Sequence, residues 1–267
     1  MKRILTLAAL AALLLTACNR LKTRTYQDNL EMPLAEHSAD SLFFDISLEY
    51  AVGGYGLSDE ARDAMNAAIG VQAFDLEQME GSLEENAVQY REGLIEEYLT
   101  ENGAGGMEPL TWEDRINGVF TERFYQWENY LLSYYSYRGG AHGIQTVSQL
   151  VFNRHTGALL AEEEFFRPGY KEPVTALLRE AVRKEMEAED AELLPLLEME
   201  SIVPNGNFAL LDKGVQWIFQ PYEAGPYALG LVMGTVNWGA LYDYMKPDYI
   251  PNWKQYNDVR AMGMTDR

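Results

Sequence analysis

The chain has 267 residues and a formal net charge of −20, with 41 acidic residues against 21 Lys and Arg. This excess of acid excludes a protein that binds nucleic acid through basic patches, and it favours basic partners or simply a soluble surface. Cys18 is the single cysteine, so no disulfide forms within the chain and stability must come from a hydrophobic core.

The first residues have the pattern of a bacterial lipoprotein signal. Two basic residues precede an apolar run from Ile4 to Leu15, and Leu-Thr-Ala then leads to Cys18. The run is about a dozen residues long, whereas a membrane span needs roughly 20. We predict a signal peptide over 1–17 and a lipid on Cys18, which makes the membrane a partner through this anchor. The alternative is an ordinary secretory signal with an incidental cysteine.

Residues 18–39 show no hydrophobic period, and we expect them to form a tether between the lipid and the folded body. Residues 40–110 are predicted to form an N-terminal α+β segment. Its expected elements are a strand over 41–50, a helix that begins at Ser58 or Asp59, and a second helix from about Ser82 to Thr100.

Residues 111–246 are predicted to form a second α+β unit, and 247–267 a polar tail. Aromatic residues crowd 120–137, which favours one long strand before the glycine loop that holds His142. The further expectations are strands at 144–152, 159–160, 207–211, 215–219 and 229–236, and helices at 172–188, 192–200 and 238–245. Because helices and strands do not alternate regularly, we predict an α+β fold, with a mostly antiparallel sheet and helices packed on one face.

Three short motifs carry a resemblance to a known family. They are Gly139-Gly140-Ala141-His142-Gly143, then Phe152-Asn153-Arg154-His155-Thr156-Gly157, and, after Asn207-Phe208 and Gly214, the stretch from Gln220-Pro221-Tyr222-Glu223-Ala224-Gly225-Pro226-Tyr227 to Gly230. Over about 120–246 the chain resembles domain of unknown function 3298. That domain forms the outer part of lysozyme-sensing anti-sigma factors and also accompanies a peptidoglycan deacetylase; 41–110 more weakly resembles its usual companion domain.

The resemblance implies an α+β fold and a role in recognising something in the cell envelope. The sequence shows no sigma-factor-binding helical segment and no metal-binding esterase domain, so neither signalling nor deacetylation is implied. We expect no cofactor and no metal site.

His142 is the candidate catalytic residue, because a histidine on a glycine loop has room to move a proton. The other interpretation is that its ring pins the loop while the glycines supply unusual backbone angles. Glu162-Glu163-Glu164 is predicted to be a solvated acidic turn, and no Gly-x-Ser-x-Gly elbow supports a serine nucleophile.

The candidate binding residues are aromatic. Tyr222, Pro226 and Tyr227 lie on a loop with two prolines, where rigid rings lose little entropy on binding. Tyr135 and Tyr137 lie in the aromatic strand, and one face of it offers rings for a groove. Core packing is the alternative for both sets.

The leading hypothesis is a membrane-anchored envelope lipoprotein with a non-catalytic binding domain. Its ligand would be a basic protein such as lysozyme, or an envelope glycan. One alternative is a hydrolase of peptidoglycan or polysaccharide with His142 as acid/base. Another is a structural subunit of an envelope complex.

Overall fold

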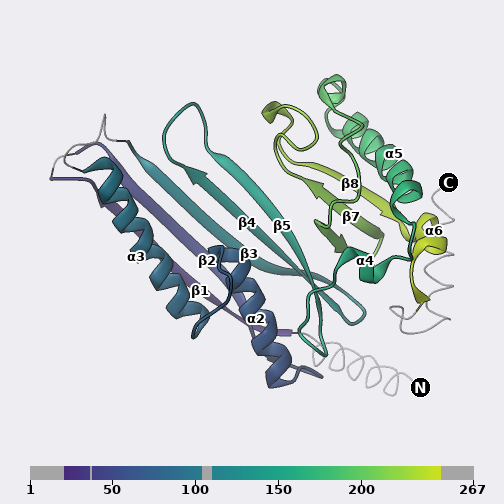
Figure 1. Cartoon of the computed structure of the whole chain (residues 1–267), viewed down its shortest axis with the longest axis horizontal. Coiled ribbons are helices and arrows are strands. Elements are labelled where there is room, and N and C mark those ends of the chain that lie inside the picture. The colour runs from purple at the N-terminus through teal and green to yellow at the C-terminus, as the bar shows by residue number, and fades with distance from the viewer. Residues whose placement is uncertain (1–20, 37, 104–109, 248–267) are drawn as a thin grey trace, which may run out of the picture.

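The structure, a computed structural model, describes residues 21–36, 38–103 and 110–247. It contains a five-stranded sheet in the order β1-β2-β3-β4-β5 and a three-stranded sheet in the order β6-β7-β8 (Figure 1). The strands are β1 (Leu21–Pro33), β2 (Ser41–Gly54), β3 (Trp112–Phe124), β4 (Trp127–Tyr137), β5 (Ile144–Asn153), β6 (Phe208–Leu210), β7 (Gly214–Phe219) and β8 (Val232–Asn237). The helices are α2 (Asp59–Phe74), α3 (Leu83–Asn102), α4 (Glu162–Phe165), α5 (Lys171–Glu189) and α6 (Trp238–Leu241), with 3₁₀ turns η1 (Leu194–Leu196), η2 (Tyr227–Leu229) and η3 (Tyr242–Tyr244).

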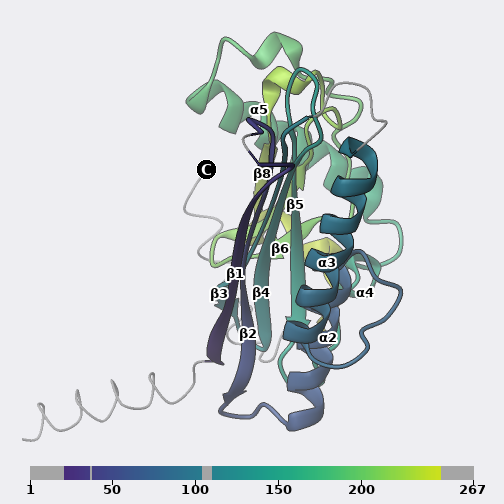
Figure 2. The same ribbon diagram turned by 90° about the vertical axis from the view of Figure 1, so that its left-hand side faces the viewer.

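The predicted α+β class is confirmed. Neighbouring strands pair antiparallel throughout, except for the parallel pair β2 and β3. This pair is parallel because α2 and α3 lie between the two strands in the chain and carry it back to the same end of the sheet. Figure 2 shows both helices on one face of the large sheet, which leaves the other face open near β1–β4.

Both predicted N-terminal helices are confirmed, and serine caps begin them. The Ser58 side chain accepts a hydrogen bond from the Ala61 amide, and Ser82 and Glu85 form a reciprocal capping box. The strand predicted over 41–50 is also confirmed. Its alternate residues Phe44 and Ile46 are buried beneath the helices, while the residues between them point to the open face.

The prediction of a tether over 18–39 is wrong for most of its length. Residues 21–33 form β1, which pairs along its whole length with β2. Tyr26 and Leu30 pack against the core, but Asp28 lies between them on the same face and pairs with Arg91 at 2.5 Å. Asp28 interrupts the alternating series of inward-facing apolar residues, so the sequence of this strand shows no hydrophobic period. Its partner, Arg91, lies on α3, far along the chain.

The aromatic segment is a hairpin rather than one long strand. β3 and β4 meet at Tyr125 and Gln126, and Tyr125 has a positive φ of 51°. No glycine, proline or Asn-Gly pair marks this turn, so the sequence carried no turn signal. The hairpin places Tyr135 and Tyr137 beside the first residues of β3.

The predicted boundary between 110 and 111 falls inside one sheet. Residues 42–48 of β2 pair with residues 112–118 of β3, and a single hydrophobic cluster contains buried residues from β2, α2, α3, β3, β4 and β5. Parallel pairing across a helical crossover joins segments far apart in sequence, which a pass along the chain does not detect.

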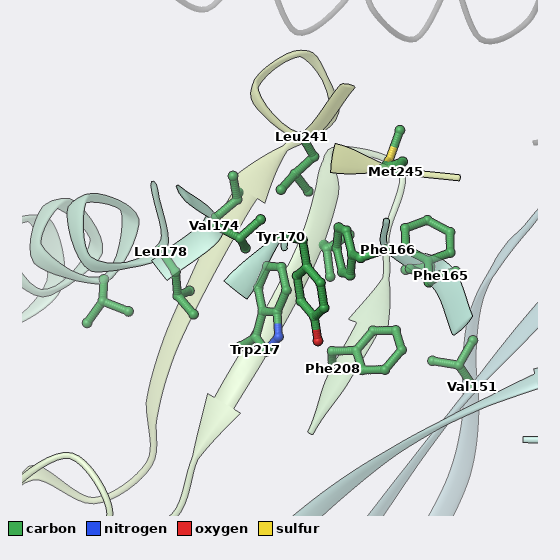
Figure 3. Packing of buried hydrophobic residues seen from close by; sticks show 14 of the residues in the cluster. Val151, Phe165, Phe166, Tyr170, Val174, Leu178, Phe208, Trp217, Leu241 and Met245 are labelled. Carbon is green, nitrogen blue, oxygen red and sulfur yellow. The ribbon is translucent and has the colours of Figure 1, made fainter. Parts of the chain in front are cut away.

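The second hydrophobic cluster surrounds the small sheet. Figure 3 shows Tyr170, Val174 and Leu178 beside Trp217 and Phe208 of the sheet. The helix predicted over 172–188 is confirmed as α5. Other expectations were too long: 192–200 contains only η1, the strand expected at 229–236 begins at Val232 after η2, and the closing helix ends at Leu241 before η3.

The expected strand at 159–160 is reduced to an isolated bridge between Leu159 and Phe152. From residue 248 on, the predicted tail lies outside the described residues. Within the described ranges, no helix is both long and apolar enough to cross a membrane.

Candidate functional site

Two side-chain amides join the small sheet to the edge of β5. Gln220 accepts from the Val147 amide at 2.9 Å and donates to its carbonyl at 2.6 Å. Asn207 accepts from the Gln149 amide at 2.7 Å and also donates to the Val147 carbonyl at 2.9 Å. These amides satisfy edge groups that a neighbouring strand would otherwise pair. They fix the 220–227 loop beside the start of β5.

The 220–227 loop presents Tyr222 in an unusual conformation. Tyr222 has a φ of 73°, in the left-handed region that bulky residues rarely adopt, and the residue is 62% exposed. Glu223 stabilises the loop, because its carboxylate accepts from the Gln220 amide and from the Asn205 side chain, each at 2.8 Å. A strained and exposed aromatic side chain is a reason to suspect a contact surface.

The loop brings Tyr222 and Tyr227 to His142. The His142 ring stacks on Tyr227 with ring centroids 3.8 Å apart and planes 16° apart. The Tyr222 hydroxyl lies 3.3 Å from His142 Nε2, and Tyr227 donates to the Gly143 carbonyl at 2.9 Å. We call His142, Tyr222 and Tyr227 the aromatic cluster. Pro226 is exposed beside it.

The glycine loop has the expected backbone geometry. Gly139 and Gly140 take φ values of 90° and 100°, and Tyr137 donates to the Gly140 carbonyl at 3.1 Å. His142 Nδ1 lies 3.0 Å from its neighbour's carbonyl, that of Gly143. One tautomer satisfies both ring nitrogens, with Nδ1–H donating to this carbonyl and Nε2 accepting from Tyr222.

This arrangement favours the structural interpretation of His142 over the catalytic one. Both ring nitrogens have partners, and neither partner is a carboxylate that would orient the ring as a general base. Within the part of the chain that the structure describes, no group of three His, Cys, Asp or Glu side chains is placed to hold a metal ion.

The open face of the large sheet is hollowed beside the aromatic cluster. A hollow of about 530 Å³ is lined by Tyr135, Tyr137 and His142, together with Glu113 and Arg115 of β3. Two adjoining hollows, of about 480 and 290 Å³, also contain Glu113 and Arg115. We call the three together the sheet trough. The residues that line it include Asn29, Glu31, Phe43, Asp45, Ser47, Glu113, Arg115, Ile116, Asn117, Ser133, Tyr134, Tyr135, Tyr137, His142 and Gln145.

The sheet trough is polar and acidic. Glu31, Asp45 and Glu113 contribute carboxylates, whereas Arg115 is the one basic side chain lining the described hollows apart from His142. Arg115 pairs with Glu113, and its guanidinium carbon lies 5.9 Å from the centre of the Tyr135 ring. The surplus carboxylates therefore give the trough a negative potential.

Of the predicted site residues, the structure brings Tyr135, Tyr137, His142, Tyr222 and Tyr227 together beside the loop between β4 and β5. Cys18 lies outside the described residues, so its lipidation stays a prediction. Sequence reasoning missed the trough residues of β1, β2 and β3. The polar residues that alternate with apolar ones in each strand predict that one face of the strand is exposed. They do not indicate that the exposed faces of three strands lie side by side.

The interpretation of residues 162–164 as a solvated turn is wrong for Glu162. Its side chain is buried, and its carboxylate accepts from Trp217 Nε1 at 2.9 Å and from the Gly206 amide at 2.7 Å. Burial raises the pKa of Glu162 above its ordinary value. Glu163 and Glu164 are exposed as expected. The helical turn of α4 points one of three adjacent glutamates inward.

This burial predicts a pH dependence of stability. Burial also raises the pKa of Glu185, so the folded protein binds protons more readily than the unfolded chain at these two sites. Their contribution to stability is therefore fully present at and below the ordinary value of 4.5 and is lost as pH rises through the folded pKa values. We expect a higher thermal midpoint at about pH 5.5 than at about pH 7.5.

Glu162→Gln tests the contribution of this group. The amide cannot ionise, but its NH₂ would face one of the two N–H donors, so we expect a loss of about 1–2 kcal/mol. The difference in unfolding free energy between the two pH values should also shrink. A thermal midpoint that rises from pH 5.5 to 7.5 in the unchanged protein would contradict the burial argument.

Comparisons with known proteins identify one part of the chain. Residues 163–239 match the family described as "Protein of unknown function (DUF3298)". The chain carries a DUF3298 domain. The match covers α5, the small sheet and the 220–227 loop, inside the range over which the sequence suggested this resemblance.

Solved DUF3298 proteins share the wider fold. A member of the family from Bacteroides fragilis has a TM-score of 0.76 and 19% identity, covering 91% of this chain and 99% of its own. A family member from Pseudomonas aeruginosa has a TM-score of 0.64 and 15% identity, covering 88% of this chain and 99% of its own. At these identities the likeness shows the fold alone. No curated protein matches the chain.

Proposed function

We propose that this protein is a lipid-anchored, non-catalytic binding protein of the bacterial cell envelope, and that its ligand is a basic protein of the lysozyme kind. The observation that carries the proposal is the convergence of an exposed, strained Tyr222, the His142–Tyr227 stack and the acidic sheet trough. The resemblance to the outer domain of lysozyme-sensing factors points to the same class of partner.

Charge supports a basic partner over an acidic one. The chain has a net charge of −20, and carboxylates outnumber basic groups in the sheet trough. Complementary potentials speed encounter and suppress wrong partners, and this effect weakens as salt screens it. An envelope glycan is the other ligand class that a polar trough with tyrosines would admit, and the binding test includes it.

The aromatic cluster supplies the specific contacts in this proposal. Tyr side chains in rigid settings are frequent interface hot spots, because they bury large areas at little entropic cost. Tyr222 is held by its backbone conformation and by His142, and Tyr227 by the ring stack and the Gly143 carbonyl. Both tyrosines are thus ordered before a partner arrives.

Tyr222→Ala should weaken binding of a basic protein such as lysozyme by about 2 kcal/mol, roughly a thirtyfold rise in Kd. Tyr55→Ala is a matched control, because Tyr55 is 74% exposed and lies in the turn before α2, outside the trough and the cluster. Titration calorimetry would measure both. Equal Kd values for the two variants would show that the aromatic cluster is not part of the binding surface.

Anchoring rests on Cys18. Replacing Cys18 with serine removes the site of lipid attachment, so molecules of the variant from which residues 1–17 have been cleaved should leave the membrane fraction. Fractionation of cells that express either form, with mass spectrometry of the N-terminal residue, would check this. Membrane retention of the cleaved serine variant would refute the lipid anchor.

A further inference from the structure

A separate pocket of about 500 Å³ lies on the helix-covered side of the large sheet, between the end of α2, α3 and the strands β3–β5. Its volume is in the range of small-molecule sites, which is roughly 300–1,000 Å³. It shares only Ile116 and Tyr134 with the lining of the sheet trough, whose hollows open on the other side. The function proposed above makes no use of it.

The floor of this pocket is apolar. Phe74 at the end of α2, Ile116 of β3 and Leu132 of β4 are buried side chains that also line it. Thr146 and Ser148 of β5 are half-buried lining residues and add hydroxyls. A ligand here would place an apolar group against the floor.

Two tyrosines supply acceptors in the lining. Tyr90 of α3 and Tyr134 of β4 donate to the same oxygen of Asp114, at 3.0 and 3.3 Å. Burial, followed by the negative charge of Asp114, raises the pKa of Tyr90, so its phenol stays protonated. With both protons directed to Asp114, the hydroxyl oxygens are left as acceptors for a ligand.

The negative charge of Asp114 is offset by Arg138. Arg138 contacts both of its oxygens, at 2.5 and 2.9 Å, and lies over the Trp112 ring at 4.5 Å. This bidentate pair offsets the buried carboxylate and holds the tyrosines in place. The remaining charge of the pocket therefore comes from the residues at its rim.

The rim favours positive charge for two reasons. Asp75 is exposed and lines the pocket, and no Lys or Arg is among the lining residues that the structure describes. Asp75 also ends α2, whose last turn has no basic residue, so the partial negative charge of the helix C-terminus adds to the carboxylate.

We propose that this pocket binds a small organic cation: a primary amine that carries one apolar ring. The ring lies on the floor formed by Phe74, Ile116 and Leu132. The ammonium group donates to the tyrosine oxygens and is attracted by Asp75 and the α2 C-terminus.

Phenethylamine and phenylacetate are suitable probes, because they share the ring but carry opposite charges. In titrations of residues 19–267, which contain every described element, phenethylamine should bind saturably and at least tenfold more tightly than phenylacetate. Asp75→Asn should bring the two Kd values within about threefold. Asn tolerates the φ of 52° at this position, so the variant keeps its fold.

Two further variants complete the test. Asp190→Asn alters the aspartate that ends α5, away from the pocket, and should leave the preference for the amine unchanged. Thr146→Phe fills the pocket from β5 and should abolish binding of both probes. Absence of saturable binding, equal affinity for the two probes, a preference that survives Asp75→Asn, or binding that survives in folded Thr146→Phe would overturn the proposal.

Discussion

Glu128→Ala is expected to destabilise the protein by about 3–5 kcal/mol, because it leaves the buried Arg154 guanidinium without its counter-charge. Arg154 is 1% exposed and Glu128 5%, and the two form an ion pair between β4 and the end of β5. Arg123 lies 3.9 Å from the same carboxylate. Removing the Glu128 carboxylate would therefore also leave the positive charges of Arg123 and Arg154 near each other. Chemical denaturation would measure the loss.

An exposed pair provides the control. Glu187 pairs with Arg183 on the surface of α5, and Glu187→Ala should cost no more than about 0.5 kcal/mol. Replacing both buried partners, as in E128M/R154L, should restore much of the stability lost in Glu128→Ala, since no charge then remains buried. Equal losses for Glu128→Ala and Glu187→Ala would mean that the buried pair is not formed.

Gly157→Ala is expected to cost about 3 kcal/mol or more. Gly157 has a φ of 73°, and a Cβ there would overlap the Ala61 carbonyl oxygen in the first turn of α2. The left-handed backbone costs an alanine about 1–2 kcal/mol, and overpacking against a helix backbone adds about 1–3 kcal/mol. The glycine is thus required where the 153–158 turn contacts α2.

Gly169→Ala separates the two causes. Gly169 also has a positive φ, of 84°, but a Cβ there would meet nothing within 4 Å. It should cost only the backbone part, about 1 kcal/mol, in the same denaturation experiment. A Gly157→Ala loss equal to that of Gly169→Ala would contradict the close contact with α2.

Arg154 and Gly157 show what the motif from Phe152 to Gly157 encodes. The sequence predicts a tight turn over 153–157, and the structure confirms a turn there. Its buried Arg154 and its glycine also dock the turn on the segment before and within α2, since Arg154 Nε donates to the Tyr55 carbonyl at 3.1 Å. Local patterns predicted the turn, but its long-range contacts depend on where α2 folds back.

The same limit applies to the strands and to the site. Hydrophobic alternation predicted β2 and serine caps predicted α2 and α3, because these signals are local. The strand β1 and the β3–β4 hairpin were missed, because Asp28 depends on Arg91 and Tyr125 turns without a glycine. The tyrosines and His142 were chosen from the sequence. Their convergence, and the acidic trough beside them, depend on strand pairing that the sequence does not display.

The side-chain amide contacts between β5 and the small sheet position the candidate binding surface. Gln220 and Asn207 hold the DUF3298 segment against the large sheet, so the 220–227 loop reaches the glycine loop of His142. The candidate surface therefore spans both sheets. Any test of binding needs the chain from before Leu21, because β1 contributes Asn29 and Glu31 to the trough.

The most direct test of the central claim is the binding of residues 19–267 to lysozyme across a salt series, with peptidoglycan fragments as the second ligand. We predict saturable binding to lysozyme that weakens as salt increases and is lost when Tyr222 and Tyr227 are both alanine. Absence of binding at low salt, binding to peptidoglycan fragments alone, or lysozyme binding that survives the double substitution would contradict the account.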